Sequence, residues 1–261
     1  RFGAGDFAQA IPVRHAKHPD ELGELATTIN TMGADIHQML EAKRTLLLAI
    51  SHELRSPLTR ARLNTELLPE TPEVQQSREA LLRDLGQMRD LVTDLLESER
   101  LASPHAALLR EATDLAALVA EVVAALDGPT SRESTIVQAL QPHMPVLQLD
   151  RTRMRLLLRN LLDNALRHSV DAAQSPQVSL AQSADGAIQI TVRDFGAGVS
   201  DDQLPHLAQP FYRPDTARTR DGGGVGLGLY LCKLVALAHG GSFTVRNAQP
   251  GLAVCVTLPK P

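Results

Sequence analysis

The chain has 261 residues, enough for two small modules, and 43% of them are hydrophobic, enough to build a core. Only 3% are aromatic and the formal net charge is −4. Nucleic-acid sites use stacking rings or basic surfaces, so this composition argues against a nucleic-acid partner. Cys232 and Cys255 form no CxxC pair, which indicates reduced thiols rather than a zinc site or a disulfide. No stretch reaches the roughly 18 apolar residues of a membrane helix. Because the first residue is Arg, we expect a soluble piece of a longer protein.

The first half of the chain carries heptad patterns, which are typical of helices that pack against partner helices. The first seam follows Pro19 and consists of Leu22, Leu25, Ile29, Met32, Ile36 and Met39. A second seam recurs every seven residues and consists of Leu47, Leu54, Ala61 and Leu68. The offset between the two seams amounts to four inserted residues. The sequence therefore predicts one long helix with a phase break at 40–46.

Pro69 and Pro72 are expected to end this helix, and a third seam follows at Leu81, Leu85, Met88, Val92 and Leu95. Two helices joined by a short turn form a hairpin. One hairpin cannot cover its own apolar face, so the sequence predicts a homodimer in which two hairpins form a four-helix bundle. A monomeric helical subdomain packed on the rest of the chain is the alternative. Ser103 and Pro104 are expected to form a linker.

From about residue 107 the pattern predicts an α+β sandwich. The expected helices are 115–126, 151–168 and 227–239. The expected strands are 134–140, 146–149, 177–180, 187–193, 242–247 and 253–258, with a hairpin turn at 184–186. Residues 196–224 are rich in Gly and Pro and show little apolar periodicity, which predicts a long loop.

One segment of the first long helix, residues 51–58 (SHELRSPL), carries side chains suited to nucleophilic chemistry. With the seam leucines toward the core, His52 falls on the outer face, which Arg55 and Ser56 share. An exposed imidazole is substantially neutral at pH 7 and has a lone pair for attack. Glu53 is placed to accept a proton from the other ring nitrogen, and Arg55 to neutralise charge on a phosphoryl group.

Three later segments together indicate a nucleotide site. Asn160 and Asn164 lie four residues apart on one helix face, and carboxamide oxygen is a hard ligand that suits Mg²⁺ beside a triphosphate. Residues 194–198 (DFGAG) end a strand with a carboxylate acceptor and two glycines that let the backbone approach a flat ligand. Residues 222–229 (GGGVGLGL) run into a helix, where free N–H groups face an anion. This last segment is neither a Walker A loop nor a dinucleotide fingerprint.

The order of these segments, with Pro210-Phe211-Tyr212-Arg213 before the last, resembles that of the orthodox sensor histidine kinases of two-component systems, especially their osmosensing and envelope-stress members. The resemblance implies three parts. Residues 1–41 resemble the second half of a HAMP signal-transfer domain. Residues 42–103 would form the dimerisation and histidine phosphotransfer hairpin. Residues 107–261 would form a GHKL (Bergerat-type) ATP-binding domain.

The resemblance implies that ATP phosphorylates His52, which then passes the phosphoryl group to an Asp of a response regulator receiver domain. Glu53 would be the general base or orienting group, and Arg55 would belong to the same catalytic set. Ser56 stands where many relatives carry a Thr or Asn that orients a hydrolytic water, so phosphatase activity toward the regulator is also implied. The full-length parent would lie in a bacterial inner membrane, with this chain as its cytoplasmic portion.

The resemblance also implies residues for ATP and Mg²⁺. Asn164 would ligate Mg²⁺, Asn160 would support the metal and the phosphates, and Asp194 would accept a hydrogen bond from the adenine amino group. Residues 199–223 would form a lid. The other implied nucleotide residues are Arg167, His168, Gly196, Gly198, Phe211, Arg213, Gly224, Val225, Gly226, Leu227, Gly228 and Leu229.

Two other interpretations stay open. In the first, the chain is a GHKL ATPase in which water attacks ATP, although the helix with the two asparagines contains no Glu that could act as its base. In the second, the chain is a catalytically silent dimeric scaffold that relays a signal. The presence of the His, Asn, Asp and glycine segments together argues against it.

Overall fold

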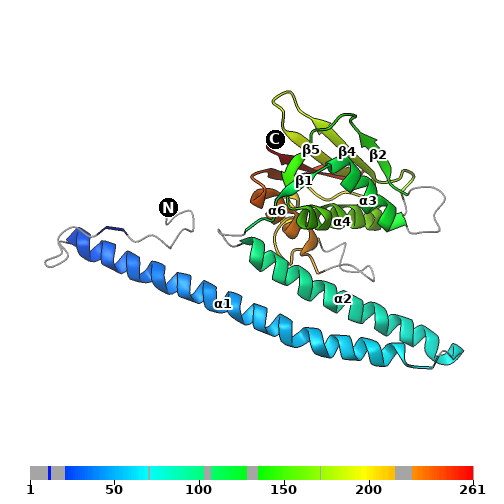
Figure 1. The fold of residues 1–261 in the computed structure, drawn as a ribbon, viewed down its shortest axis with the longest axis horizontal. Coiled ribbons are helices and arrows are strands. Elements are labelled where there is room, and N and C mark those ends of the chain that lie inside the picture. Colours follow the sequence, from blue (N-terminus) through cyan, green and yellow to red (C-terminus); the bar gives the residue numbers. More distant parts are fainter. Residues whose placement is uncertain are drawn as a thin grey trace. The chain divides into compact units, whose positions relative to one another are not determined.

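A computed structural model describes residues 11–12, 21–69, 71–102, 107–127, 135–170, 172–214 and 225–260 (Figure 1). Inside the helices, the side chains of Arg44, His52, Pro72 and Glu73 are not described. The expected linker at Ser103 lies outside the described residues. The chain divides into two compact units, residues 1–92 and residues 93–261.

The first unit is a helical hairpin. Helix α1 (Glu21–Glu66) is followed, after a short turn, by α2 (Pro72–Ala102), whose last ten residues belong to the second unit. Arg78 closes the turn: its Nε and Nη2 donate hydrogen bonds to the carbonyl oxygens of Thr65 and Glu66, at 3.2 and 3.1 Å. These carbonyls lie in the last turn of α1, where the regular helical hydrogen-bond pattern ends. The long first helix and the break before Pro72 are therefore confirmed.

The apolar seam of α1 is largely uncovered within the single chain. Five residues of the predicted seams are exposed, Leu22, Leu25, Met32, Met39 and Leu54, and the other large apolar side chains exposed along this helix are Leu40, Leu46, Ile50 and Leu63. Soluble proteins rarely leave so continuous an apolar row in water. The prediction of a four-helix bundle made by two hairpins depends on such an uncovered row, because a second hairpin would bury it.

The second unit is a two-layer sandwich. Its main sheet has the order β2 (Val137–Leu140), β4 (Gln177–Gln182), β5 (Ile188–Arg193), β7 (Leu252–Leu258) and β6 (Ser242–Asn247). Strands β2 and β4 are parallel, and the other pairs are antiparallel. A separate antiparallel pair joins β1 (Glu111–Thr113) to β3 (Leu147–Leu149). The described helices are α3 (Leu115–Asp127), α4 (Arg151–His168), α6 (Gly228–Ala238) and the short 3₁₀ helix η2 (Leu204–His206).

Helices α3, α4 and α6 cover one face of the main sheet (Figure 1). Ile188, Ile190 and Val192 of β5 alternate inward and are buried against them, as a half-covered strand requires. Cys232 is also buried in this core, which agrees with its predicted role as a core thiol. The α+β sandwich is confirmed. None of the described helices combines the length and the apolar character needed to cross a membrane.

Candidate active site

The proposed nucleophile segment lies in the middle of α1. Ser51 is buried, whereas Glu53, Arg55 and Ser56 are exposed, as their heptad positions predict. The Ser56 hydroxyl accepts a hydrogen bond from Nη1 of Arg60, one turn later, at 2.7 Å. The backbone of His52 is helical. This segment therefore presents a carboxylate, a guanidinium and a held hydroxyl on the solvent side of the helix.

In the second unit, α4 presents Asn160 to the start of α6. A Cβ added to Gly228 would lie 3.9 Å from Cγ and Oδ1 of Asn160, at ordinary van der Waals distance, so the Asn160 side chain lies beside the first residue of α6. The Asn160 Nδ2 is buried and has no hydrogen-bond partner among the described residues. A buried amide without a partner is costly, so Asn160 is suited to binding a polar ligand. Asn164 is half-buried on the next turn.

Asp194 is fixed directly after β5. Its side chain is only 5% exposed, and its Oδ1 accepts hydrogen bonds from the backbone N–H groups of Gly196 and Leu252, at 3.0 and 3.2 Å. Its own N–H donates to the carbonyl oxygen of Leu252 at 2.9 Å. Among the described residues nothing bonds to Oδ2. The carboxylate is therefore held in one orientation, with one oxygen left for a ligand.

The loop after Asp194 packs tightly on the end of α4. A Cβ on Gly196 would lie 2.6 Å from the carbonyl oxygen of His168, so only glycine fits there. The Ser169 hydroxyl accepts a hydrogen bond from the N–H of Phe195 at 3.1 Å. The structure thus brings the predicted residues His168 and Gly196 together. It adds Ser169, which no motif in the sequence indicated.

The glycine-rich segment joins the segment around Phe211. The N–H of Phe211 donates to the carbonyl oxygen of Gly226 at 3.0 Å, and a Cβ on Gly226, whose φ is +84°, would lie 2.7 Å from the Tyr212 carbonyl oxygen. The Phe211 ring is 58% exposed. Leu227 is the N-cap of α6 and supplies no side-chain cap, so the first N–H groups of α6 keep their affinity for an anion.

The other predicted nucleotide residues lie at different exposures. Arg167 and His168 are exposed in the last turn of α4, Arg213 is half-buried, Val225 is exposed and Leu229 is half-buried. Gly224, and residues 215–223 of the expected lid, lie outside the described residues.

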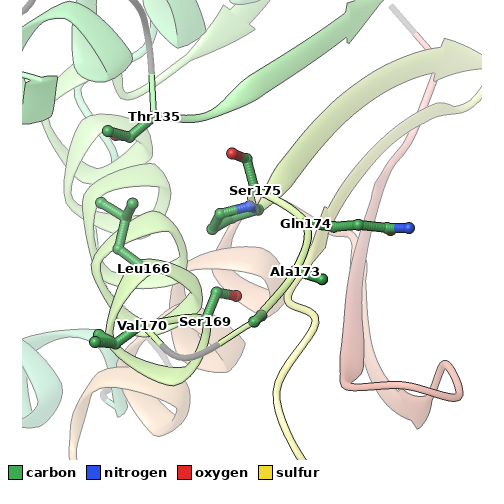
Figure 2. A pocket seen from close by; sticks show the side chains of 9 residues that line it. Thr135, Leu166, Ser169, Val170, Ala173, Gln174 and Ser175 are labelled. Carbon is green, nitrogen blue, oxygen red and sulfur yellow. The ribbon is translucent and has the colours of Figure 1, made fainter.

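Two cavities border this region. The larger, of about 240 Å³, lies between the end of α4 and the start of β4; Figure 2 shows Leu166 and Ser169 on its wall. None of the predicted nucleotide residues lines it. The smaller, of about 190 Å³, is lined by Gly198 together with Ala197, Val199, Asn247, Gln249, Pro250 and Gly251.

In the described part of the chain, no group of three or more His, Cys, Asp or Glu side chains lies close enough together to hold a metal ion. The oxygen donors at this site are the carboxamides of Asn160 and Asn164. Uncharged oxygen donors suit Mg²⁺ when the triphosphate itself brings the negative charge.

Two parts of the chain match known protein families. Residues 42–104 match the His Kinase A (phospho-acceptor) domain, and residues 149–261 match the family of histidine kinase-, DNA gyrase B-, and HSP90-like ATPases. The chain is 32% identical over 265 residues to the signal transduction histidine-protein kinase BaeS of Escherichia coli, covering 99% of this chain and 55% of that protein. It is 30% identical over 278 residues to the sensor histidine kinase MtrB of Mycolicibacterium paratuberculosis, covering 100% of this chain and 47% of that protein. The chain thus spans about half the length of these relatives.

Solved structures show the same fold. The structure of full-length ShkA in complex with AMPPNP aligns with a TM-score of 0.68 and 26% identity, over 82% of this chain and 45% of that one. The histidine kinase AdeS of Acinetobacter baumannii aligns with a TM-score of 0.56 and 23% identity, over 79% and 96% of the two chains. A phospho-acceptor domain is followed by an ATPase domain, and nearly the whole of this chain aligns with such kinases, so this chain belongs to the sensor histidine kinases of two-component systems.

Proposed function

We propose that this chain uses ATP to phosphorylate His52 and then passes the phosphoryl group to an aspartate of a response regulator receiver domain. The observation that carries the nucleotide part is the fixed carboxylate of Asp194, which has one oxygen free among the described residues, in the same unit as the unpartnered amide of Asn160. The phospho-acceptor family match over residues 42–104 supports His52 as the acceptor.

In the first step, a ring nitrogen of neutral His52 attacks the γ-phosphorus of ATP. An N–P bond forms, the bond from phosphorus to the β–γ bridging oxygen breaks, and ADP leaves with that electron pair. Glu53 takes the proton from the other ring nitrogen, which keeps the phosphoimidazole neutral at the ring. Exposed Arg55 stabilises the charge on the transferred group.

In the second step, a carboxylate oxygen of the regulator's aspartate attacks the same phosphorus. The N–P bond breaks and His52 returns to its neutral form after taking up a proton. Ser56 lies one helical turn from His52, and its hydroxyl is held by Arg60, so it is placed to orient a water. We therefore include a phosphatase activity toward the phosphorylated regulator in the proposal.

In the second unit, Asp194 accepts a hydrogen bond from the adenine amino group, and the loop glycines Gly196 and Gly198 leave room for the ring. The N-terminal end of α6 and Gly226 face the phosphates. Mg²⁺ fits Asn164 and Asn160 by the chemistry of their carboxamide oxygens, and it supplies charge neutralisation at the triphosphate. Arg167, His168, Phe211, Arg213, Val225 and Leu229 complete the nucleotide surface, together with Gly224.

The remaining proposals concern the whole protein. Residues 1–41 are a partial HAMP segment, residues 42–103 the phosphotransfer hairpin, and residues 107–261 the ATP-binding domain. The exposed seam of α1 supports a homodimer in which two hairpins form a four-helix bundle. The parent protein lies in a bacterial inner membrane, with this part on the cytoplasmic side, and it has no nucleic-acid partner.

Nucleotide binding by the purified chain tests this proposal. ATP affinity is measured by titration calorimetry with and without Mg²⁺, for the unchanged protein, Asn164→Ala and Asp194→Asn. We expect Asn164→Ala to lose the gain in affinity that Mg²⁺ gives, and Asp194→Asn to bind at least tenfold more weakly in either condition. Unchanged Mg²⁺ dependence in Asn164→Ala would contradict the assigned metal ligand.

ATP turnover then distinguishes the alternatives. The proposal predicts that the protein becomes labelled from γ-labelled ATP and that His52→Gln is not labelled. Steady release of free phosphate by His52→Gln, with no labelled protein in any sample, would instead support a GHKL ATPase. Nucleotide binding with neither label nor phosphate release would support a silent relay scaffold.

A further inference from the structure

We propose that Asn247, the last residue of β6, is a positioning residue for the adenine-binding loop, here defined as residues 194–199. This inference rests on the proposed function, because it assigns the loop to the adenine base. It concerns a side chain that is distant in sequence from every nucleotide motif.

The Asn247 carboxamide holds one residue of the loop, Val199, through both its oxygen and its nitrogen. Its Oδ1 accepts a hydrogen bond from the N–H of Val199 at 3.3 Å, and its Nδ2 donates to the Val199 carbonyl oxygen at 2.8 Å. The same Nδ2 donates to Oδ1 of Asp201 at 2.9 Å. A side chain that bonds both backbone polar groups of one residue fixes that residue as a paired strand would.

The residue just before Val199 is tightly packed against the Asn247 side chain. Gly198 has a φ of +70°, and a Cβ there would lie 3.0 Å from Oδ1 of Asn247. The carboxamide therefore packs against the backbone of the second loop glycine while it bonds to Val199. A cavity of about 190 Å³ lies beside this contact, and its lining includes Gly198, Val199 and Asn247.

The other end of the loop is held by the same β6–β7 turn. Leu252 exchanges hydrogen bonds with Asp194, and a Cβ on Gly251 would lie 2.1 Å from the Asp194 carbonyl oxygen. Arg193, just before the loop, donates from Nη2 to the Ala248 carbonyl oxygen at 2.8 Å, and its guanidinium lies 4.6 Å from the centre of the Phe195 ring. Loop and turn therefore form one unit, in which Asn247 supplies the contacts at the far end from Asp194.

Asn247 does not reach the reacting atoms, so its effect is on the orientation of the base. A loop released at Val199 leaves the Asp194 carboxylate held firmly only by the N–H of Leu252, because its other donor, the N–H of Gly196, lies in the loop, and its direction toward the amino group of adenine becomes less fixed. The triphosphate contacts come from α4 and α6 and are unaffected. Loss of Asn247 should therefore weaken binding of the base selectively.

The first test is amide hydrogen exchange of the nucleotide-free protein, which needs no activity. In Asn247→Ala we expect the Val199 amide and its neighbours in residues 194–201 to exchange at least tenfold faster, while β4 and β5 keep their protection. The matched control is Thr244→Ala, on the exposed side of the same strand. Unchanged exchange at Val199 in Asn247→Ala would overturn the proposal.

The second test compares binding of ATP with binding of inosine triphosphate, which lacks the 6-amino group. We expect Asn247→Ala to bind ATP about tenfold more weakly and inosine triphosphate less than about twofold more weakly. An equal loss for both nucleotides would indicate general destabilisation and overturn the positioning role. If the unchanged protein bound neither nucleotide, the proposed function would fail, and Asn247 would be judged by the exchange measurement alone.

A third test exchanges the amide of position 247 with the carboxylate of position 201 and asks whether the protection of the Val199 amide recovers. Asn247→Asp places an oxygen in front of the Val199 carbonyl and the Asp201 carboxylate, so we expect it to loosen the loop as much as Asn247→Ala does. Adding Asp201→Asn restores a donor between positions 201 and 247, so the double variant should recover part of the Val199 protection. No recovery would mean that the bond to Asp201 contributes nothing to holding the loop.

Discussion

The backbone N–H of Asp150 donates a hydrogen bond to Nε2 of His239 at 3.1 Å, joining the start of α4 to the end of α6 across 89 positions of sequence. Nδ1 of the same ring lies 2.8 Å from the Val235 carbonyl oxygen and donates to it. One nitrogen accepts while the other donates, so this arrangement requires the neutral imidazole. The uncharged imidazole of His239 therefore connects helices α4 and α6 of the second unit.

Protonation of His239 at low pH should weaken this connection and lower the free energy of unfolding. Burial lowers the pKa of His239 below its ordinary value and outweighs the hydrogen bond to the Val235 carbonyl, which raises it; the nearby Arg110 and Arg153 also lower the pKa, against the Asp150 carboxylate. Because the unfolded chain takes up this proton near pH 6.5 and the folded chain does so only at lower pH, stability is complete above about 6.5 and falls below it. Urea unfolding at pH 7.5 and pH 5.5 measures the loss. His239→Gln should show less of it, whereas the control His143→Asn, at an exposed position, should behave like the unchanged protein.

The ion pair between Glu97 of α2 and Arg153 of α4 should contribute measurably to stability. Its Oε1–Nε distance is 2.9 Å and the two side chains are only 17% and 14% exposed. Removing one partner leaves the other charge poorly solvated, so Glu97→Ala should lower the free energy of unfolding by about 2 kcal/mol. The exposed pair of Arg62 and Glu66 is the control, and Glu66→Ala should cost less than about 0.5 kcal/mol. Equal costs for the two variants would contradict this assignment.

Two glycine substitutions should have opposite effects. In Gly251→Ala the new Cβ would lie 2.1 Å from the Asp194 carbonyl oxygen at a φ of +82°, so we expect a loss of more than about 2 kcal/mol and weaker ATP binding. A Cβ on Gly86 of α2 would meet nothing within 4 Å, so Gly86→Ala should stabilise the hairpin by about 0.5–1 kcal/mol. Thermal unfolding of both variants checks the signs.

Dimerisation should depend on the uncovered seam of α1. Ile50 and Leu54 are exposed within the single chain, so Ile50→Glu combined with Leu54→Glu should shift the protein to the monomer in analytical ultracentrifugation. Leu109→Glu changes an exposed leucine of the other unit and should leave the dimer intact. A monomeric unchanged protein at high concentration would contradict the four-helix bundle.

Sequence reasoning succeeded where the signals were local. Helix α4 has the predicted bounds because Asp150 caps it, with Oδ1 accepting from the N–H of Arg153, and because its buried residues follow the helical period. Strand β6 likewise matches the prediction, since an alternating pattern is bounded by Gly241 and by the turn after Asn247.

The remaining features depend on contacts between distant residues. Strand β1 has three residues, too few for a period, and the parallel pairing of β2 with β4 is set by the covering helices rather than by either strand. Asp194 was predicted from its motif, but its partner Leu252 lies 58 positions later, and Asn247 lies 48 positions from Val199. Neither residue carries a pattern that indicates its partner.

The most direct test of the central claim is to find where the phosphoryl group goes. The purified protein is incubated with Mg²⁺ and ATP, digested under alkaline conditions and analysed by mass spectrometry. We predict a single phosphoryl group on the peptide that contains His52, stable in alkali and lost in acid, and absent from His52→Gln. Phosphate on another residue, or the same yield of phosphorylated protein from His52→Gln, would contradict the assignment of His52 as the phosphoryl acceptor.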